Sequence, residues 1–194
     1  MSTIIGLTGP TGAGKSTASE AAEKLGFKIV DCDKLAHAAV EKGTAGYNAV
    51  ISAFKTDILN CDGTIDRKRL AKAAFSSKEN TELLNRTLLP HIVLLVKEEA
   101  DAEMVLLDAP TLFESGINNM CDATVAVLAY EEIRLERITA RDGIDNEAAM
   151  LRIRAGKPDA FYKENADYII YNNGETERFI FEFKKIIHGI MGKI

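Results

Sequence analysis

Long apolar runs, basic clusters and paired cysteines are all missing from this sequence of 194 residues. Its longest apolar stretches, such as residues 92–96 and 104–107, are far shorter than the roughly 20 residues that a membrane-spanning helix needs. The formal net charge is −5, and no run of Lys or Arg offers a surface to a nucleic-acid backbone or an anionic membrane. We therefore expect no membrane and no nucleic-acid partner, and any phosphate binding should be confined to one site.

The cysteines are few and do not suggest a disulfide or a metal site. Cys32, Cys61 and Cys121 are odd in number, widely spaced, and without CxxC or histidine partners at metal-ligand spacing. We interpret them as small buried or half-buried residues of a reduced, cytoplasmic protein. The chain enters an apolar segment at once, with no basic stretch before it, so we also expect no signal peptide.

Short apolar runs that alternate with helical patterns predict the fold class. Five of these runs are typical of strands that are covered on both faces: residues 3–8, 28–31, 104–108, 124–129 and 168–171. Apolar residues at helical spacing predict a first helix over residues 15–25 and a last helix over residues 175–190. This alternation predicts an α/β fold in which a parallel five-stranded sheet is wrapped by helices on both sides.

Two stretches interrupt the alternation because they contain no convincing strand. Residues 34–101 carry helical patterns and turns, which predict a helical insertion between the second and third strands. Residues 140–165 are charged, with the composition of a mobile lid over phosphates, although a solvated helical hairpin would have the same composition. The expected divisions are a core of residues 1–33, 102–139 and 166–194, an insertion of residues 34–101, and a lid of residues 140–165.

The stretch GPTGAGKS, Gly9 to Ser16, matches G-x-x-x-x-G-K-[ST] and lies between a predicted strand and a predicted helix, as this motif requires. Its glycines allow backbone N–H groups to turn inward and form an anion cradle at the positive end of a helix. We expect Lys15 to reach the β- and γ-phosphates of a nucleoside triphosphate, and Ser16 to place its hydroxyl on Mg²⁺. The alternative, a glycine-rich turn with an incidental Lys-Ser, would have to match motif and context by chance. Water, a protein or a small molecule could each be the acceptor.

Other parts of the sequence narrow the class of phosphate-loop protein. A guanine-nucleotide switch needs N/T-K-x-D, and the nearest match, residues 156–159, reads GKPD and lacks the Asn or Thr. A motor or transporter ATPase would need far more chain. A small kinase remains, and such an enzyme needs a carboxylate beside the loop to align and deprotonate the acceptor hydroxyl.

Two carboxylates and one arginine are candidates for this chemistry. Asp33 follows the second strand, where it is either the base or the N-cap of the next helix. Asp108 ends the third strand, an arrangement that holds Mg²⁺ directly or through water, opposite Ser16. Arg141 opens the charged stretch and could place a cation on the transferring phosphoryl group. We interpret Arg137, one helical turn earlier, as a surface or salt-bridge residue.

At this point the sequence resembles the dephospho-coenzyme A kinase family over nearly its whole length. The resemblance is carried by residues 7–17, 29–33, 62–67, 108–114, 134–142 and 166–174. The D-x-D of residues 31–33 and the P-x-L-F-E of residues 110–114 are its more specific parts. It implies a three-layer P-loop NTPase fold with a helical acceptor-binding domain and a lid. It also implies transfer of the γ-phosphate of ATP to the ribose 3′-hydroxyl of dephospho-coenzyme A, which gives coenzyme A.

The resemblance also implies roles for single residues. Thr8 and Asp33 would lie near the acceptor hydroxyl, with Asp33 as its base, and Phe113 would line the acceptor pocket, although it could also be a core residue. Arg141 would serve the lid, and Asn173 would lie beside the adenine. The ATP-binding positions would be Gly12, Ala13, Gly14, Lys15, Ser16 and Thr17. The alternatives are another P-loop nucleoside or nucleotide kinase, or a module that holds ATP without transfer.

Four places depart from the usual family pattern. Pro10-Thr11 replaces Gly-Ile at variable positions of the loop, which a backbone cradle tolerates. Leu89-Pro90-His91 stands where His-Pro is usual, so His91 receives no role. His37 replaces a frequent Arg, either as a pH-dependent cation or as an exposed helix residue. Gly156 replaces a usual Gln in the lid. We expect a monomer or a weak homo-oligomer.

Overall fold

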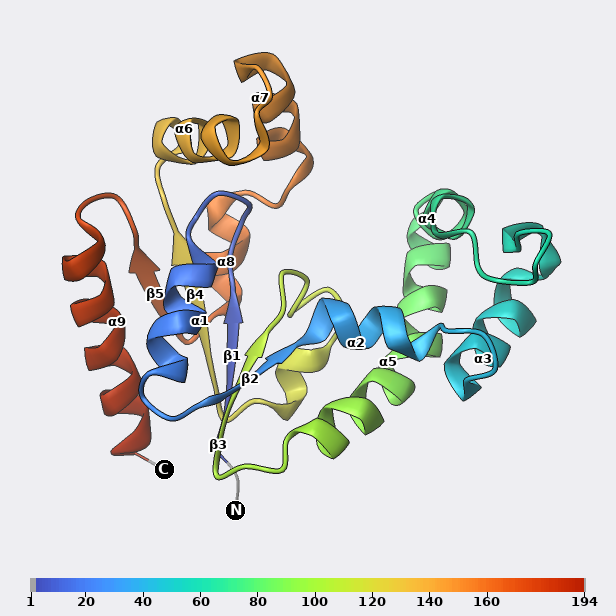
Figure 1. Ribbon diagram of the computed structural model, residues 1–194, viewed down its shortest axis with the longest axis horizontal. Helices are drawn as coiled ribbons and strands as arrows, with labels where there is room; N and C mark the ends of the chain where they lie inside the picture. The colour runs from blue at the N-terminus through green and yellow to red at the C-terminus, as the bar shows by residue number, and fades with distance from the viewer. Residues whose placement is uncertain (1–2, 194) are drawn as a thin grey trace. The chain divides into compact units, whose positions relative to one another are not determined.

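The computed structural model describes residues 3–193, apart from the side chain of Thr56. These residues form two compact units (Figure 1). The sheet unit contains the chain up to Val30, then Ala102–Phe113, and the chain from Asn118 onward. The helical unit contains Asp31–Asp101 and Glu114–Ile117. The helical unit is thus built from two separate stretches of the chain.

The sheet has five strands in the order β2-β3-β1-β4-β5. Their bounds are β1 Thr3–Thr8, β2 Lys28–Asp31, β3 Met104–Asp108, β4 Ala123–Leu128 and β5 Tyr168–Tyr171. The central strand β1 runs parallel to both of its neighbours, with Ile5 opposite Leu106 on one side and Ala123 on the other. Strand β5 runs parallel to β4. The predicted α/β fold is confirmed, and β4 begins and ends one residue earlier than the pattern indicated.

Five α-helices belong to the sheet unit: α1 Lys15–Glu23, α6 Glu131–Asp142, α7 Asn146–Ala155, α8 Asp159–Asn165 and α9 Thr176–Met191. A short 3₁₀ helix, η2, covers Ile117–Met120. Helix α1 ends two residues before the predicted Leu25, because the chain turns at Gly26 with φ of 92°. Helix α9 lies within one residue of its predicted range.

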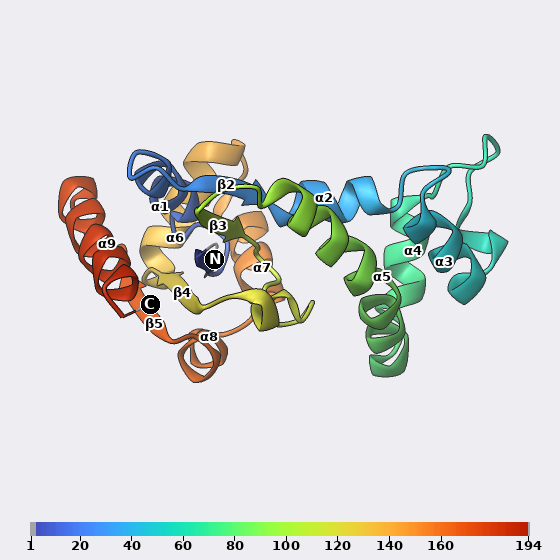
Figure 2. The ribbon, with the colours of Figure 1, turned by 90° about the horizontal axis from the view of Figure 1, so that it is seen from below.

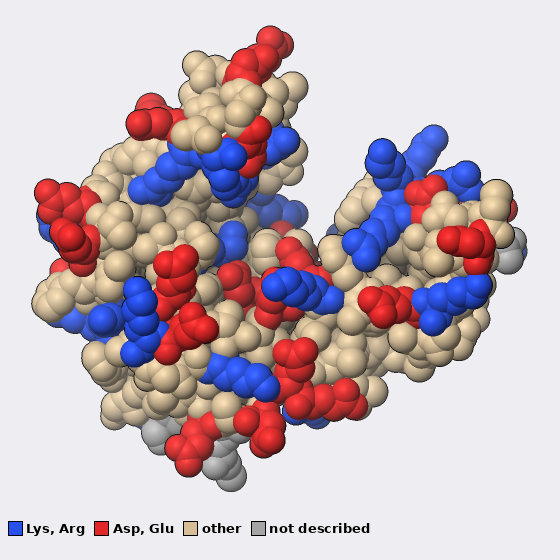
Figure 3. Space-filling model, in the orientation of Figure 1, with Lys and Arg blue, Asp and Glu red and all other residues tan. Residues whose placement is uncertain are grey.

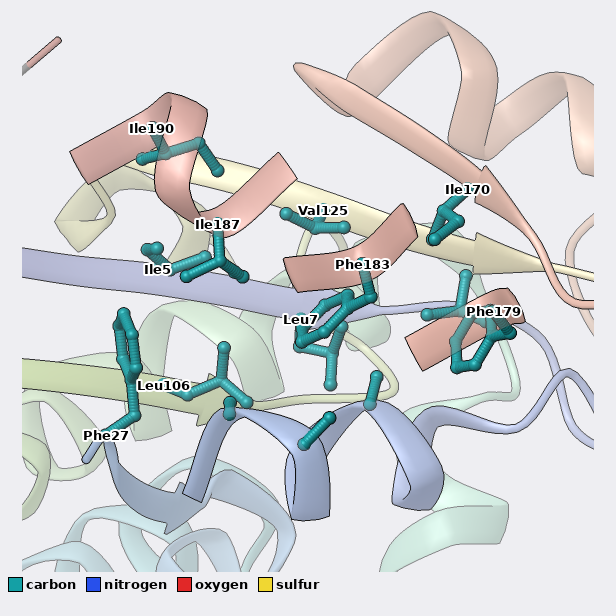
Figure 4. Close-up of a cluster of buried hydrophobic side chains, with 14 of the residues drawn as sticks. Ile5, Leu7, Phe27, Leu106, Val125, Ile170, Phe179, Phe183, Ile187 and Ile190 are labelled. Carbon is teal, nitrogen blue, oxygen red and sulfur yellow. The ribbon is translucent and has the colours of Figure 1, made fainter. Parts of the chain in front are cut away.

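Alternating side chains on the strands divide the interior into two layers of contacts. Ile5 and Leu7 of β1 pack into a cluster with α1 and α9 that contains Phe179 and Phe183 (Figure 4). The intervening Gly6 faces the other side, where a Cβ would lie 2.8 Å from Leu112 Cδ2. Because successive residues of a strand point to opposite faces, both sides of β1 are buried, which explains its unbroken apolar run.

A glycine within α9 offers a test of how backbone entropy affects the stability of this helix. Gly189 is exposed in the helix, and a Cβ there would meet nothing within 4 Å. We expect Gly189→Ala to raise the free energy of unfolding by about 0.5–1 kcal/mol, because alanine loses less backbone entropy than glycine when a helix forms. Denaturant unfolding measures the change, and a destabilised variant would contradict it.

The helical unit consists of α2 Cys32–Ala39, α3 Ala45–Phe54, η1 Thr56–Ile58, α4 Arg67–Ala74 and α5 Lys78–Glu99. Helix α5 lies beside α2 and α3, as both ribbon views show (Figure 2). The N-caps Thr44, Asp66 and Ser77 each accept a backbone N–H from the first turn of the helix that they begin. Val50, Ile58 and Leu70 form the centre of its small core.

The Asp62–Arg67 segment of the family pattern builds a turn in this unit. Gly63 has φ of 79°, and Asp62 accepts hydrogen bonds from the backbone N–H and the hydroxyl of Thr64 at 2.9 and 2.6 Å. Asp66 then caps α4. Asp62, Gly63, Thr64 and Asp66 therefore shape the loop that leads into α4.

Charged side chains of both signs are intermixed on the face of the molecule in Figure 3. Within residues 3–193 no helix is both long and apolar enough to cross a bilayer. Exposure separates the cysteines more than the sequence suggested: Cys32 is buried, Cys121 is half-buried, and Cys61 is exposed, so the expectation of burial is wrong for Cys61.

The cysteines should therefore differ in reactivity. Burial, followed by the charges of Asp122 and Asp167, raises the pKa of Cys121 to about 12, so this thiol is protonated at neutral pH. We expect iodoacetamide at a pH of about 8 to label Cys61 in the native protein and all three cysteines only after unfolding. Peptide mass spectrometry identifies the labelled residue, and faster labelling of Cys121 would contradict the assignment.

Candidate active site

The loop that joins β1 to α1 has the backbone conformation of a phosphate-binding loop. Gly9, Gly12 and Gly14 have φ of 144°, 79° and 98°, values that L side chains rarely adopt. Gly14 is the N-cap of α1, and no side chain among the described residues caps this helix. The first turn also lacks an acidic residue. The start of α1 thus carries no negative side chain of its own that would compete with an anion, which the helix dipole favours.

Close packing holds this loop on three sides. A Cβ at Gly9 would lie 2.1 Å from the carbonyl oxygen of Val127, and one at Gly14 would lie 2.1 Å from Nδ2 of Asn172. At Gly12 a Cβ would lie 2.9 Å from the carbonyl oxygen of Arg134. The glycines of the motif are therefore required by space as well as by φ.

The polar residues Lys15, Ser16 and Thr17 form the start of α1. The Lys15 ammonium donates to the carbonyl of Gly9 at 2.8 Å, which draws the side chain back over its own loop. An ammonium carries three N–H donors, which suit the oxygens of a phosphate group. Ser16 is exposed, whereas Thr17 is half-buried.

Residues far along the chain hold the loop by hydrogen bonds to its backbone carbonyl groups. The Asn172 side chain is buried, and its Nδ2 donates to the carbonyl of Ala13 at 3.0 Å. Arg137 Nη1 lies 3.3 Å from the same carbonyl and 3.4 Å from that of Gly12, and its Nη2 donates to Asn172 Oδ1. Our interpretation of Arg137 as a surface or salt-bridge residue is therefore wrong, because its guanidinium contacts loop carbonyls.

Asp108, the last residue of β3, has a hydrogen-bond partner that the sequence did not suggest. The Ser19 hydroxyl, from the buried side of α1, donates to Asp108 Oδ2 at 2.8 Å. This bond orients the carboxylate through Oδ2 and does not involve Oδ1. Mg²⁺ usually takes one or two protein oxygens together with substrate phosphates. The hydroxyl of Ser16 and the carboxylate of Asp108 are donors of this kind, so the residues present fit Mg²⁺. The described part of the chain holds no cluster of three or more His, Cys, Asp or Glu that could bind a metal.

The other predicted residues of the sheet unit make specific contacts. Thr8 is fully buried, and its hydroxyl donates to the carbonyl of Pro110 at 3.2 Å. Phe113 packs edge-on against Phe161 of α8, with ring centroids 6.0 Å apart. Asn173 Oδ1 accepts the backbone N–H of Tyr130 at 2.7 Å. The amide Nδ2 of Asn173 is thus the group that could donate to a ring nitrogen of a purine.

Arg141 is held by a carboxylate at the end of α6. Its Nε and Nη2 donate to the two oxygens of Asp142 at 2.7 and 3.0 Å, and Arg152 of α7 also contacts Asp142. Hydrogen bonding between Arg141 and Asp142 raises the pKa of the arginine and lowers that of the carboxyl. Both side chains of this pair stay charged at neutral pH, and Nη1 of Arg141 is the group that could reach a phosphoryl oxygen.

In the helical unit, the N-cap of α2 is Asp31, whose side chain accepts the backbone N–H of Lys34 at 3.0 Å. Asp33 is an exposed residue in the first turn. The alternative interpretation of Asp33 as the N-cap is therefore wrong. The N-terminal end of a helix is a favourable place for a carboxylate.

The remaining residues that depart from the family pattern each lie in a helix or at its end. His37 is exposed in the last turn of α2, and His91 follows Pro90 inside α5. Gly156 ends α7 with φ of −81°, so a side chain could occupy this position without backbone strain.

The fold and the loop together define a P-loop kinase: a parallel sheet with a glycine-rich phosphate loop after its central strand, at the start of a helix. A family model described as Dephospho-CoA kinase matches residues 3–178. The chain belongs to this family.

Similar proteins agree with this assignment. The chain is 38% identical over 186 residues to Dephospho-CoA kinase of Fusobacterium nucleatum, with 94% of each chain covered. It is 33% identical to Dephospho-CoA kinase of Arabidopsis thaliana, with 95% of this chain and 82% of that one covered.

Solved structures with this fold cover the whole chain. TT1252 from Thermus thermophilus is 28% identical with a TM-score of 0.76, and 98% of its chain is covered. Dephospho-CoA kinase from Campylobacter jejuni is 29% identical with a TM-score of 0.63, and all of its chain is covered. Shikimate kinase from Acinetobacter baumannii, 20% identical with a TM-score of 0.57 and 95% covered, shares the fold alone.

Proposed function

We propose that this protein transfers the γ-phosphate of ATP to the ribose 3′-hydroxyl of dephospho-coenzyme A, giving coenzyme A and ADP. The observation that carries the proposal is the family match over residues 3–178. This range includes the phosphate loop, the D-x-D of residues 31–33 and the P-x-L-F-E of residues 110–114, so both the donor side and the acceptor side of the reaction lie within it.

On the donor side, residues 12–17 bind the phosphates of ATP, and Lys15 contacts the β- and γ-phosphates. Ser16 and Asp108 would hold Mg²⁺, which supplies positive charge beside the phosphates. Ser19 would hold the Asp108 carboxylate in place through the 2.8 Å bond to Oδ2. Asn173 donates from Nδ2 to the adenine ring.

On the acceptor side, Asp33 orients the 3′-hydroxyl and accepts its proton as the oxygen attacks phosphorus. Asp33 is exposed in the first turn of α2, where the N-terminal end of the helix is a favourable place for a carboxylate. Thr8 and Phe113 border the acceptor site, where Thr8 fixes the turn at Pro110 and Phe113 offers a ring edge.

Arg141 stabilises the charge that spreads over the transferring phosphoryl group. Asp142 holds its guanidinium, and the Nη1 group then contacts the phosphate. We assign residues 140–165 to a lid, residues 34–101 to acceptor binding, and residues 1–33, 102–139 and 166–194 to the nucleotide-binding core. We further propose a cytoplasmic protein that is a monomer or a weak homo-oligomer, which light scattering would test.

The test is an acceptor assay with purified protein, ATP and Mg²⁺. Dephospho-coenzyme A should give ADP and coenzyme A in equal amounts, and omission of the acceptor should reduce ADP release to background. Transfer to a nucleoside or nucleoside monophosphate instead would favour another P-loop kinase. Tight ATP binding without transfer to any acceptor would favour a module that only holds the nucleotide.

A further inference from the structure

We propose that Arg134 is a positioning residue that fixes the shape of the phosphate loop from behind, through the carbonyl of Thr11. Arg134 lies on α6, and its Nε donates to the Thr11 carbonyl at 2.9 Å across a sequence separation of 123 residues. Its side chain is only 6% exposed. The backbone of the same residue contacts the loop, since a Cβ at Gly12 would lie 2.9 Å from its carbonyl oxygen. Figure 1 shows the loop between β1 and α1 rising to α6.

The physical reason lies in the geometry of an anion cradle. Loop N–H groups that turn toward a phosphate leave neighbouring carbonyl groups turned away from it, and each buried carbonyl needs a donor of its own. Arg137 and Asn172 supply donors to Gly12 and Ala13, and Arg134 supplies the donor to Thr11. Three successive carbonyls of the loop are therefore fixed by side chains from α6 and from the segment after β5.

The surroundings of Arg134 argue against a role in stability alone. Burial lowers the pKa of its guanidinium, and Asp159, the first residue of α8, opposes this effect. The pair is long, 3.8 Å from Nη1 to Oδ1, and the buried Nη2 has no hydrogen-bond partner among the described residues. A guanidinium that is buried with partners this incomplete has a desolvation cost that these contacts offset only in part. An apolar replacement would remove the 2.9 Å bond to Thr11 together with the long ion pair to Asp159, whose side chain is 36% exposed and can be solvated.

This inference rests on the proposed function only in that the loop binds ATP, so binding is measured without an acceptor. The variants are Arg134→Met, which keeps volume and removes the donors, and Arg134→Lys, which keeps one donor and the charge. Arg178→Met, at an exposed position of α9, is the matched control. Calorimetric titration with ATP gives Kd, steady-state kinetics gives the KM of each substrate, and thermal unfolding reports stability.

We expect Arg134→Met to raise the Kd and KM for ATP about tenfold, which corresponds to the loss of one charge-assisted hydrogen bond. The KM for dephospho-coenzyme A and the melting temperature should stay close to those of the unmodified protein, and Arg134→Lys should recover part of the affinity. The proposal is overturned if Arg134→Met binds ATP normally, or if both KM values rise in parallel with a fall in melting temperature. An absence of turnover in the unmodified protein would refute the proposed function and leave the ATP titration valid.

Discussion

Asp33→Asn is expected to lower kcat by about 10²- to 10⁴-fold, the range for loss of a general base, and to leave ATP affinity unchanged. The amide has the size of the carboxylate but accepts a proton poorly. The 3′-hydroxyl would therefore lose its base, while the residues around it stay in place. Asp33 belongs to the first turn of α2 in the helical unit, whereas the phosphate loop belongs to the sheet unit. Nucleotide binding and turnover should therefore separate in this variant.

Asp31→Asn is the matched control for this experiment. Asp31 caps α2 through its bond to the Lys34 N–H, and asparagine caps helices as well as aspartate. We expect its kcat to stay close to that of the unmodified enzyme. Steady-state kinetics and ATP titration are measured on both variants. An equal fall in kcat in the two would mean that the negative charge of residues 31–33 matters and not the identity of the base. Normal turnover of Asp33→Asn would exclude Asp33 as the base.

Gly14→Ala is expected to abolish measurable ATP binding and, with it, turnover. The new Cβ would lie 2.1 Å from Asn172 Nδ2, a buried group that is itself bonded to the carbonyl of Ala13. The φ of 98° adds backbone strain for any L side chain. Relief of either strain would move the N–H groups at the start of α1, which are the proposed phosphate ligands.

Gly189→Ala provides the control for Gly14→Ala, because the same methyl group enters open space in α9. This variant should bind ATP as the unmodified protein does. ATP titration and circular dichroism distinguish loss of the site from loss of the fold. An affinity for ATP within about twofold of normal in Gly14→Ala would show that Asn172 yields readily, and would remove it from the residues that shape the loop.

The fold could be predicted from the sequence because its signals are local. Strands buried on both faces give short unbroken apolar runs, and β1 and β3 have the predicted bounds. The phosphate loop is also a local signal, since the motif requires a strand before it and a helix after it. The sheet order is not local: β1 lies between β3 and β4, which follow it by about a hundred residues.

The residues behind the loop were missed or misjudged because their partners are distant backbone carbonyls. Nothing near Arg134 or Arg137 in the sequence marks an acceptor, and the acceptors belong to Thr11, Gly12 and Ala13. Ser19 was missed for a similar reason, since its partner Asp108 is 89 residues away. Asn172 had a weak signal, because it stands beside Asn173 in the family pattern.

The order in which these parts are synthesised follows from the strand order. The first strand to leave the ribosome is the middle strand of the finished sheet. The helical unit is complete once residue 117 has emerged, including the 2.6 Å bond from the Asn85 amide to the carbonyl of Glu114. At that stage β4, α6 and the segment after β5 have not been made. Because domains fold as units during synthesis, a nascent chain can hold a finished helical unit before its phosphate loop has taken shape.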